Sequence, residues 1–137
     1  MTRGAFLDTS VLIDALVPDH PDHHERAADL IRQVGAGALV VHISHTVLFE
    51  AAYVLSKTYH IPRNHVADEL TNLLKLENLV LPDKPLMVTT LRLWSDESAL
   101  SFADCYHLVL AESLGLDAIY AVDRKLGRYP GVERLEP

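Results

Sequence analysis

The chain has 137 residues, the length of one ordinary domain, and its content of 49% hydrophobic residues excludes an intrinsically disordered protein. Its apolar runs fall well short of the roughly 20 residues that a membrane-spanning helix requires. The net charge of −7 excludes broad electrostatic adhesion to nucleic acid, which depends on clustered Lys and Arg, but it is compatible with a nuclease whose site is built from carboxylates.

Strand-like and helix-like segments alternate along the chain. Near-continuous apolar runs predict strands covered on both faces, and apolar residues spaced by three and four predict helices. In chain order we predict a strand over 3–7, a helix from Thr9 to the proline at 18, a helix from residue 20 to the glycines at 35 and 37, a strand over 38–43, helices over 44–59 and 62–76, a strand over 79–81, helices over 84–94 and 101–114, and strands over 117–122 and 132–135. This alternation predicts an α/β fold, a three-layer α/β/α sandwich with a mostly parallel central sheet, in one domain over 1–137.

The start of the chain and its cysteine content both indicate a reducing compartment. Residues 1–7 reach an acid at Asp8 before an apolar run long enough for a secretory signal can form. Cys105 is the single cysteine, which excludes an internal disulfide, and we expect it to be a small buried hydrophobe. We therefore expect a complete, cytoplasmic protein with no membrane association.

Two acids follow predicted strands directly. Asp8 lies at the carboxyl end of the first strand, and Asp123 lies at the carboxyl end of the strand over 117–122. Ligands of open α/β sheets bind at this edge, so the two acids are candidates for one site. Asp is also favoured as the residue that caps a helix start, which is the alternative role for each of them.

Glu50 lies within the predicted helix over 44–59. It comes three residues after Val47 and four before Val54, so we expect it to share their apolar face. A glutamate on a buried face is costly unless it pairs with a cation or binds a metal. A salt bridge to Arg or Lys and a metal site are therefore the two alternatives for Glu50.

Asp104 comes three residues after Ser101, at the start of a predicted helix. This spacing is typical of a capping box, in which the two side chains bond to each other's backbone N–H groups. Metal binding is compatible with such a position, because a helix start stabilises a carboxylate.

The four acids are too far apart in the sequence for local structure to explain them as a set. Carboxylates that gather in one site stay ionised together only if cations lie between them. Because all the ligands are oxygens, Mg²⁺ or Mn²⁺ is expected rather than zinc. We therefore predict that one or two such ions are held, directly or through water, by four residues: Asp8, Glu50, Asp104 and Asp123.

Motifs around these acids resemble those of the PIN-domain family, and within it the VapC-type toxins of type II toxin–antitoxin pairs. The resemblance covers nearly the whole chain, and four segments carry it in order: Phe6-Leu7-Asp8-Thr9-Ser10, Glu50, Ser101-Phe102-Ala103-Asp104 and Ile119-Tyr120-Ala121-Val122-Asp123-Arg124-Lys125-Leu126. One position departs from the pattern. The family often has Thr or Ser two residues before its last acid, where this chain has Ala121, so a hydroxyl that could orient Asp123 is absent.

The resemblance implies a PIN-like domain that hydrolyses RNA phosphodiester bonds as a metal-dependent endoribonuclease, with the four acids as catalytic and metal-binding residues. It also implies a homodimer and a small antitoxin partner that blocks the acidic cleft. Thr9 or Ser10 could bond to Asp8 or to a metal-bound water, or could cap the first helix. Four large apolar residues line either a groove for the partner or the core: Leu48, Leu55, Leu91 and Trp94.

Basic and histidine residues offer further candidates. Arg124, Lys125 and Arg128 follow the last acid and either meet RNA phosphates or form a solvated basic turn. The histidines at 20, 23 and 24 and at 42 and 45 have zinc-like spacings but lack cysteine partners, and the first group is expected to mark an exposed helix start. His107, one turn after Asp104, could reach the acid site.

Three alternatives to a toxin ribonuclease remain open. The first is a PIN nuclease of RNA maturation that has no antitoxin. The second is a degenerate PIN fold that binds RNA or protein without cleavage, for which Ala121 is the one supporting feature. The third is a phosphohydrolase with Asp8 as nucleophile, which Ser10 opposes because such enzymes usually carry a second acid at that position.

Overall fold

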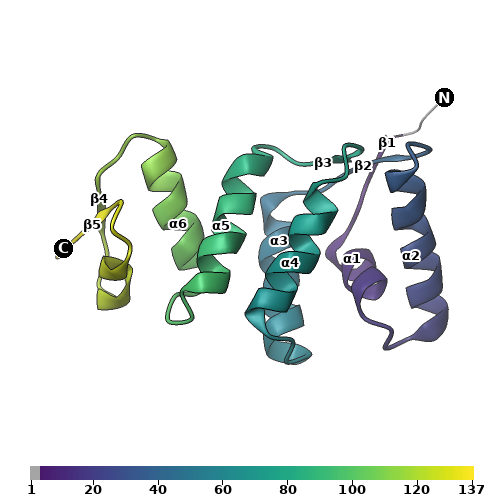
Figure 1. Ribbon diagram of the computed structural model, residues 1–137, viewed down its shortest axis with the longest axis horizontal. Helices are drawn as coiled ribbons and strands as arrows, with labels where there is room; N and C mark the ends of the chain where they lie inside the picture. Colours follow the sequence, from purple (N-terminus) through teal and green to yellow (C-terminus); the bar gives the residue numbers. More distant parts are fainter. Residues whose placement is uncertain (1–3) are drawn as a thin grey trace. The chain divides into compact units, whose positions relative to one another are not determined.

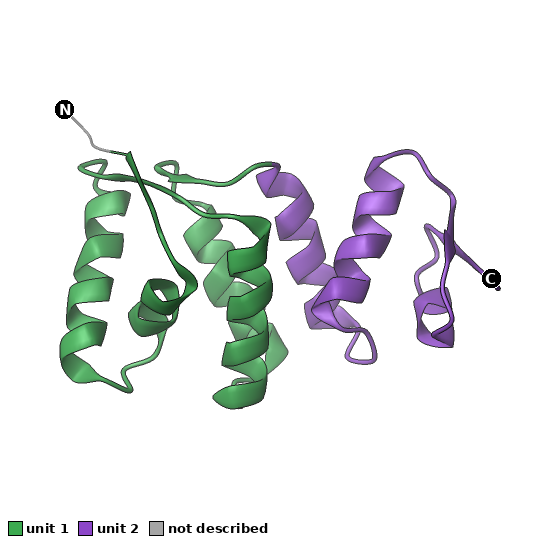
Figure 2. Cartoon of the chain, turned by 180° about the vertical axis from the view of Figure 1, so that it is seen from behind, with its two compact units in different colours: residues 1–82 green, residues 83–137 purple. Residues whose placement is uncertain are grey.

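A computed structural model describes residues 4–137 of the chain and divides it into two compact units. Unit 1 ends at Pro82 and unit 2 runs from Asp83 to Pro137 (Figure 2). The predicted first strand began at Arg3, which lies outside the described residues. No helix within 4–137 combines the length and apolar character needed to cross a membrane.

Unit 1 is built on three parallel strands in the order β1-β2-β3. Phe6 of β1 is opposite His42 of β2, and His42 is opposite Val80 of β3. The elements of this unit are β1 (Gly4–Phe6), α1 (Thr9–Leu16), α2 (Pro21–Gly35), β2 (Val40–His42), α3 (His45–Tyr53), the π-helical turn η1 (Val54–Thr58), α4 (Arg63–Leu74) and β3 (Leu79–Val80) (Figure 1).

Unit 2 contains two α-helices, a 3-10 helix and a pair of parallel strands. Its elements are α5 (Lys84–Asp96), α6 (Phe102–Ser113), β4 (Ala118–Tyr120), the 3-10 helix η2 (Arg124–Arg128) and β5 (Glu133–Leu135) (Figure 1). The ring of Trp94 meets that of Phe102 edge-on, with centroids 5.6 Å apart, which packs the end of α5 against the start of α6. Cys105 is buried on α6, as predicted.

The α/β class and the parallel pairing are confirmed, and each predicted helix and strand is found within a few residues of its expected bounds. The helix predicted over 44–59 changes to a π-helical turn after Tyr53, and η2 was not predicted. The expectation that the first strand is buried is wrong, because residues 4–6 are exposed and burial begins at Leu7. The strands pair as a group of three and a group of two, and the single domain stays a prediction.

The core of unit 1 shows why the chain folds locally as it does. Helix α3 buries Val47, Leu48, Ala51 and Ala52, which recur at the three- and four-residue spacing of one helix face. Ser44 caps the start of this helix, since its hydroxyl accepts a bond from the Val47 N–H at 3.2 Å. The Ser44 cap therefore fixes where α3, the helix that carries Glu50, begins.

Candidate active-site carboxylates

Asp8 caps the first helix of unit 1. Its backbone is extended (φ −75°, ψ 155°), and its Oδ2 accepts bonds from the Ser10 N–H at 3.2 Å and the Ser10 hydroxyl at 2.7 Å. The Ser10 hydroxyl bond, followed by the Ser10 backbone bond, holds the pKa of Asp8 below its ordinary value. The predicted capping role is confirmed, and both bonds from Ser10 are made to Oδ2.

Glu50 does not lie on the buried face of its helix, so that expectation is wrong. The buried residues of α3 form a stripe through Val47 and Ala51, and Glu50 is exposed beside it, together with Tyr53. The Thr9 hydroxyl donates a bond of 3.1 Å to Oε1 of Glu50. In the described part of the chain no Arg or Lys side chain forms an ion pair with Glu50, which removes the salt-bridge alternative there.

Asp104 and Ser101 form the predicted capping box at the start of α6. The Ser101 hydroxyl accepts a bond from the Asp104 N–H at 3.1 Å, and Oδ2 of Asp104 accepts one from the Ser101 N–H at 3.2 Å. The carboxylate is thus held by one oxygen, as in Asp8. The contacts between Ser101 and Asp104 are the two reciprocal bonds of the capping box.

Asp123 caps the 3-10 helix that follows β4. Its Oδ1 accepts a bond of 3.0 Å from the Lys125 N–H. Sequence reasoning missed Arg134 of β5, whose guanidinium donates a bond of 2.6 Å to the carbonyl oxygen of Ala121, two residues before Asp123. Although position 121 lacks a hydroxyl, its backbone is therefore tied to β5. No local pattern in the sequence signals this contact.

Each unit carries two of the four acids, Asp8 and Glu50 in unit 1 and Asp104 and Asp123 in unit 2. In unit 1, Thr9 is covalently next to Asp8 and hydrogen-bonded to Glu50, so it links the two carboxylates. In unit 2, α6 begins and β4 ends toward the same end of the unit (Figures 1 and 2), and along the chain Asp104 lies in the first turn of α6 and Asp123 shortly after β4. Within residues 4–82, and again within 83–137, no three His, Cys, Asp or Glu side chains are grouped to hold a metal ion.

The four carboxylates share one chemical property. Each has one oxygen that accepts a hydrogen bond from a hydroxyl or a backbone N–H. Such oxygens are the ligands that Mg²⁺ and Mn²⁺ prefer, so the donor set fits a hard divalent cation.

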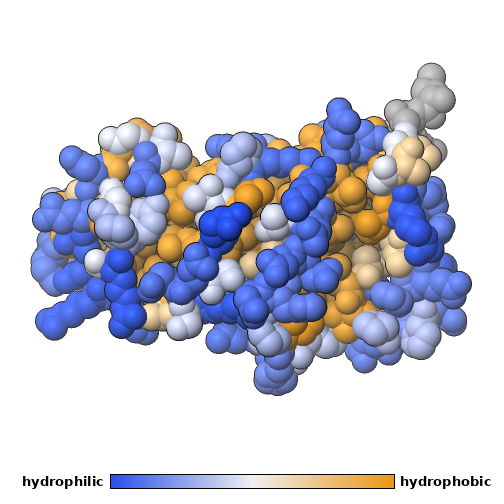
Figure 3. Space-filling view, viewed as in Figure 1, coloured by the Kyte–Doolittle hydropathy of each residue, from blue (hydrophilic) through white to orange (hydrophobic). Residues whose placement is uncertain are grey.

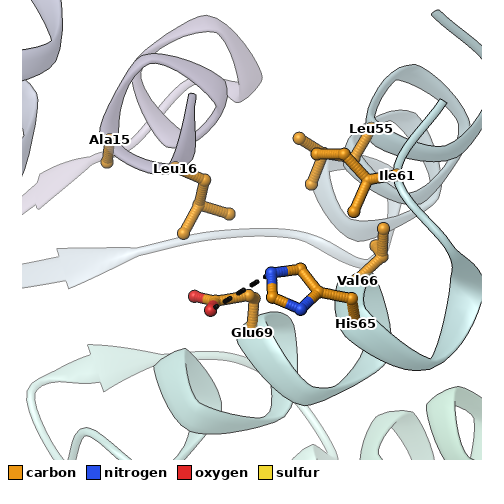
Figure 4. Close-up of a pocket in the computed structure, with 7 residues that line it drawn as sticks. All are labelled: Ala15, Leu16, Leu55, Ile61, His65, Val66 and Glu69. Atoms are coloured by element: carbon orange, nitrogen blue, oxygen red, sulfur yellow. Dashed lines mark ion pairs between the residues drawn. The ribbon is translucent and has the colours of Figure 1, made fainter. Parts of the chain in front are cut away.

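A cavity in unit 1 lies apart from these acids. It has a volume of about 140 Å³ and is lined by apolar side chains from α1, η1, α4 and the turn before α4, and by the His65–Glu69 pair, whose charged atoms are 3.8 Å apart (Figure 4). None of the predicted site residues lines it. It is therefore not the acidic site.

The remaining candidates are placed as follows. The three basic residues after Asp123 are exposed, and hydrophilic side chains gather over the end of unit 2 that carries η2 (Figure 3). His107 is exposed, and its ring is 6.1 Å from that of Tyr106. The four residues weighed as lining a partner groove are all buried, which favours the core role for Leu48, Leu55, Leu91 and Trp94.

Comparison with known proteins gives the family of the chain. The profile described as PIN domain matches residues 5–132, which covers both units and all four acids. The comparison with curated proteins found no match. PIN domains are generally nucleases. Because the match extends over nearly the whole sequence, the chain belongs to the PIN-domain family.

Proposed function

We propose that this chain is a Mg²⁺- or Mn²⁺-dependent endoribonuclease that hydrolyses RNA phosphodiester bonds in a single PIN-like domain. The observation that carries the proposal is a feature shared by Asp8, Glu50, Asp104 and Asp123: each has a carboxylate oxygen that is held by a hydrogen bond from this chain. Membership of a nuclease family indicates the reaction class. A carboxylate that is already oriented by one oxygen loses little side-chain freedom when the other binds a cation.

In this proposal the four acids act together as ligands of one or two ions. A bound divalent ion would supply positive charge for the phosphodiester and would lower the pKa of a water. The chain's own residues prepare the ligands for that role. Ser10 holds Oδ2 of Asp8 and lowers the pKa of this carboxyl group, Thr9 holds Glu50, and the capping bonds of Asp104 and Asp123 fix the directions of those carboxylates.

The exposed basic residues Arg124, Lys125 and Arg128 are proposed to meet RNA phosphates. All three lie on η2, which begins directly after Asp123, so a phosphate bound by η2 would lie near this acid. Because the protein carries a net charge of −7, such local positive charge is needed to offset its repulsion of RNA.

A cleavage assay tests the reaction. Purified full-length protein is incubated with single-stranded RNA in Mg²⁺ or Mn²⁺, with EDTA as the metal-free control. We expect cleavage that requires the metal and that falls at least about 100-fold in Asp8→Asn and Asp104→Asn, because each loses a negative ligand. The matched control is Asp68→Asn, which removes an exposed acid of α4 and is expected to cleave like wild type.

The same assay separates the degenerate-fold alternative. A chain that binds RNA but cleaves none in either metal, and that gives no Mn²⁺ heat in titration calorimetry, would support a non-catalytic PIN fold. Cleavage by Asp8→Asn and Asp104→Asn at the wild-type rate would overturn the catalytic assignment even if the wild type is active.

We further propose that the protein is the toxin of a type II toxin–antitoxin pair, acting as a homodimer on cytoplasmic RNA. The motifs around Asp8 and Asp104 support this, since they resemble those of VapC-type toxins. Expression with and without the neighbouring short reading frame tests the role. Growth arrest that the neighbour relieves, and that Asp8→Asn abolishes, is expected for a toxin. Cleavage in vitro without growth arrest would favour a PIN nuclease of RNA maturation.

A further inference from the structure

Thr9 is a buried polar residue with an unusual hydrogen-bond partner. Two polar residues are buried in the described part of the chain, Thr9 and Thr90. The Thr90 hydroxyl donates to the carbonyl of Leu86, one helical turn earlier, which is how a helical threonine usually satisfies its hydroxyl. Thr9 is the first residue of α1 and has no preceding turn, so its hydroxyl reaches Glu50 instead, 41 positions along the chain.

This contact is not part of the cap of α1. Asp8 is the capping residue, and its carboxylate is bonded to the backbone and hydroxyl of Ser10. Thr9 is only 9% exposed, and its hydroxyl donates a bond of 3.1 Å to Oε1 of Glu50. A capping role alone therefore does not account for Thr9.

The consequence concerns the freedom of Glu50. An exposed glutamate samples many rotamers, and fixing one of them costs side-chain entropy. Thr9 has a β-branched side chain with a restricted χ1 angle, and its backbone is bonded to that of Asp8. A hydrogen bond from Thr9 therefore restricts Glu50 and relates its position to the first carboxylate of the site.

We propose that Thr9 is a positioning residue that holds Glu50 through Oε1 and leaves Oε2 for a divalent cation. This inference rests on the proposed metal-dependent function. It assigns to Thr9 a role in cation affinity that acts through Glu50 and does not require contact with the ion or with RNA.

The test is Mn²⁺ binding to the full chain by titration calorimetry, together with kcat and KM for RNA cleavage. Thr9→Val removes the hydroxyl at nearly constant volume and is expected to weaken Mn²⁺ binding about 10-fold, the lower end of the effect of removing a residue that orients a metal ligand. We expect kcat at a fixed subsaturating Mn²⁺ concentration to fall with it and KM for RNA to stay within about twofold. Thr9→Ser keeps a hydroxyl and should restore most of the affinity.

Two controls separate positioning from packing. Thr90→Val removes the hydroxyl of the other buried threonine and should lower thermal stability without changing Mn²⁺ affinity. In a Glu50→Gln background, Thr9→Val should have no further effect on Mn²⁺ affinity, because the group it positions is no longer a carboxylate. If Thr9→Val strains the first turn and does not fold, Thr9→Ala removes the same hydroxyl without the extra methyl group.

The outcomes distinguish this inference from the proposed function. Wild-type affinity for Mn²⁺ in Thr9→Val or Thr9→Ala overturns the positioning role while the metal-dependent function stands. An equal loss with and without Glu50→Gln also overturns it, since Thr9 would then act by another route. A wild-type chain that binds no Mn²⁺ removes the proposed function and this inference together.

Discussion

The capping box at α6 allows the contribution of Asp104 to folding stability to be separated from its contribution to RNA cleavage. Asp104 contributes a hydrogen-bond acceptor to the helix start and, in the proposed site, a negative charge to the metal. Asp104→Asn keeps an oxygen that can accept from the Ser101 N–H but removes the charge. Asp104→Ala removes both.

The expected magnitudes follow from the two functions. Losing a capping acceptor costs about 1 kcal/mol, and for a chain of this size 1 kcal/mol corresponds to about 4 °C in Tm. Asp104→Asn should therefore unfold within about 2 °C of wild type, and Asp104→Ala about 4 °C below it. Both should lose at least about 100-fold in RNA cleavage, because several kcal/mol of transition-state stabilisation depend on the metal.

Ser44→Ala provides the matched control. Ser44 caps α3 through the Val47 N–H at 3.2 Å and lies outside the predicted site, so this variant should lose about 1 kcal/mol of stability and keep its activity at 25 °C. Thermal unfolding by circular dichroism and cleavage of a fluorescent RNA are measured on the three variants. Activity that follows Tm across them, with Asp104→Asn fully active, would refute the assignment of Asp104 to the metal.

Three further results are expected. Arg124→Ala and Lys125→Ala should each weaken RNA binding and reduce the slope of log affinity against log salt by about 0.7. The control variant Lys57→Ala, at an exposed lysine of η1, should leave the slope unchanged. Unchanged slopes in the two η2 variants would remove η2 from the RNA interface. Burial, then the hydrogen bond to Glu112, raises the pKa of Tyr129 to about 12, so the unfolded chain loses this proton near pH 10 and the folded chain does not. Stability should therefore fall between pH 10 and about 12, and Tm should fall less steeply with pH in Tyr129→Phe; identical slopes would contradict this. Removing metal with EDTA should abolish cleavage reversibly, with Mg²⁺ or Mn²⁺ restoring it, and cleavage that persists in EDTA would contradict metal dependence.

Features that depend on neighbouring residues were predictable from the sequence. Asp8 caps α1 and Asp104 completes a capping box because their partners lie two and three residues away. The order of helices and strands follows from apolar spacing and from the glycines and prolines between elements. The parallel pairing follows in turn, because helices connect each strand to the next in unit 1.

Features that join distant segments were not predictable. The bond from Thr9 to Glu50 and that from Arg134 to Ala121 depend on how elements pack, and spacing alone gives no sign of them. The prediction that Glu50 lies on the buried face was wrong for a related reason. A residue at the edge of an apolar stripe satisfies the same spacing rule as one at its centre, and only packing decides which side faces water.

The central claim is that the four carboxylates bind the same ions, and Mn²⁺ titration of four single variants tests it most directly. The variants are Asp8→Asn, Glu50→Gln, Asp104→Asn and Asp123→Asn, with Asp68→Asn as control. If the four carboxylates form one site, every one of the four variants binds Mn²⁺ more weakly than wild type and the control does not. Wild-type Mn²⁺ affinity in both Asp104→Asn and Asp123→Asn, alongside weakened binding in Asp8→Asn and Glu50→Gln, would contradict a shared site.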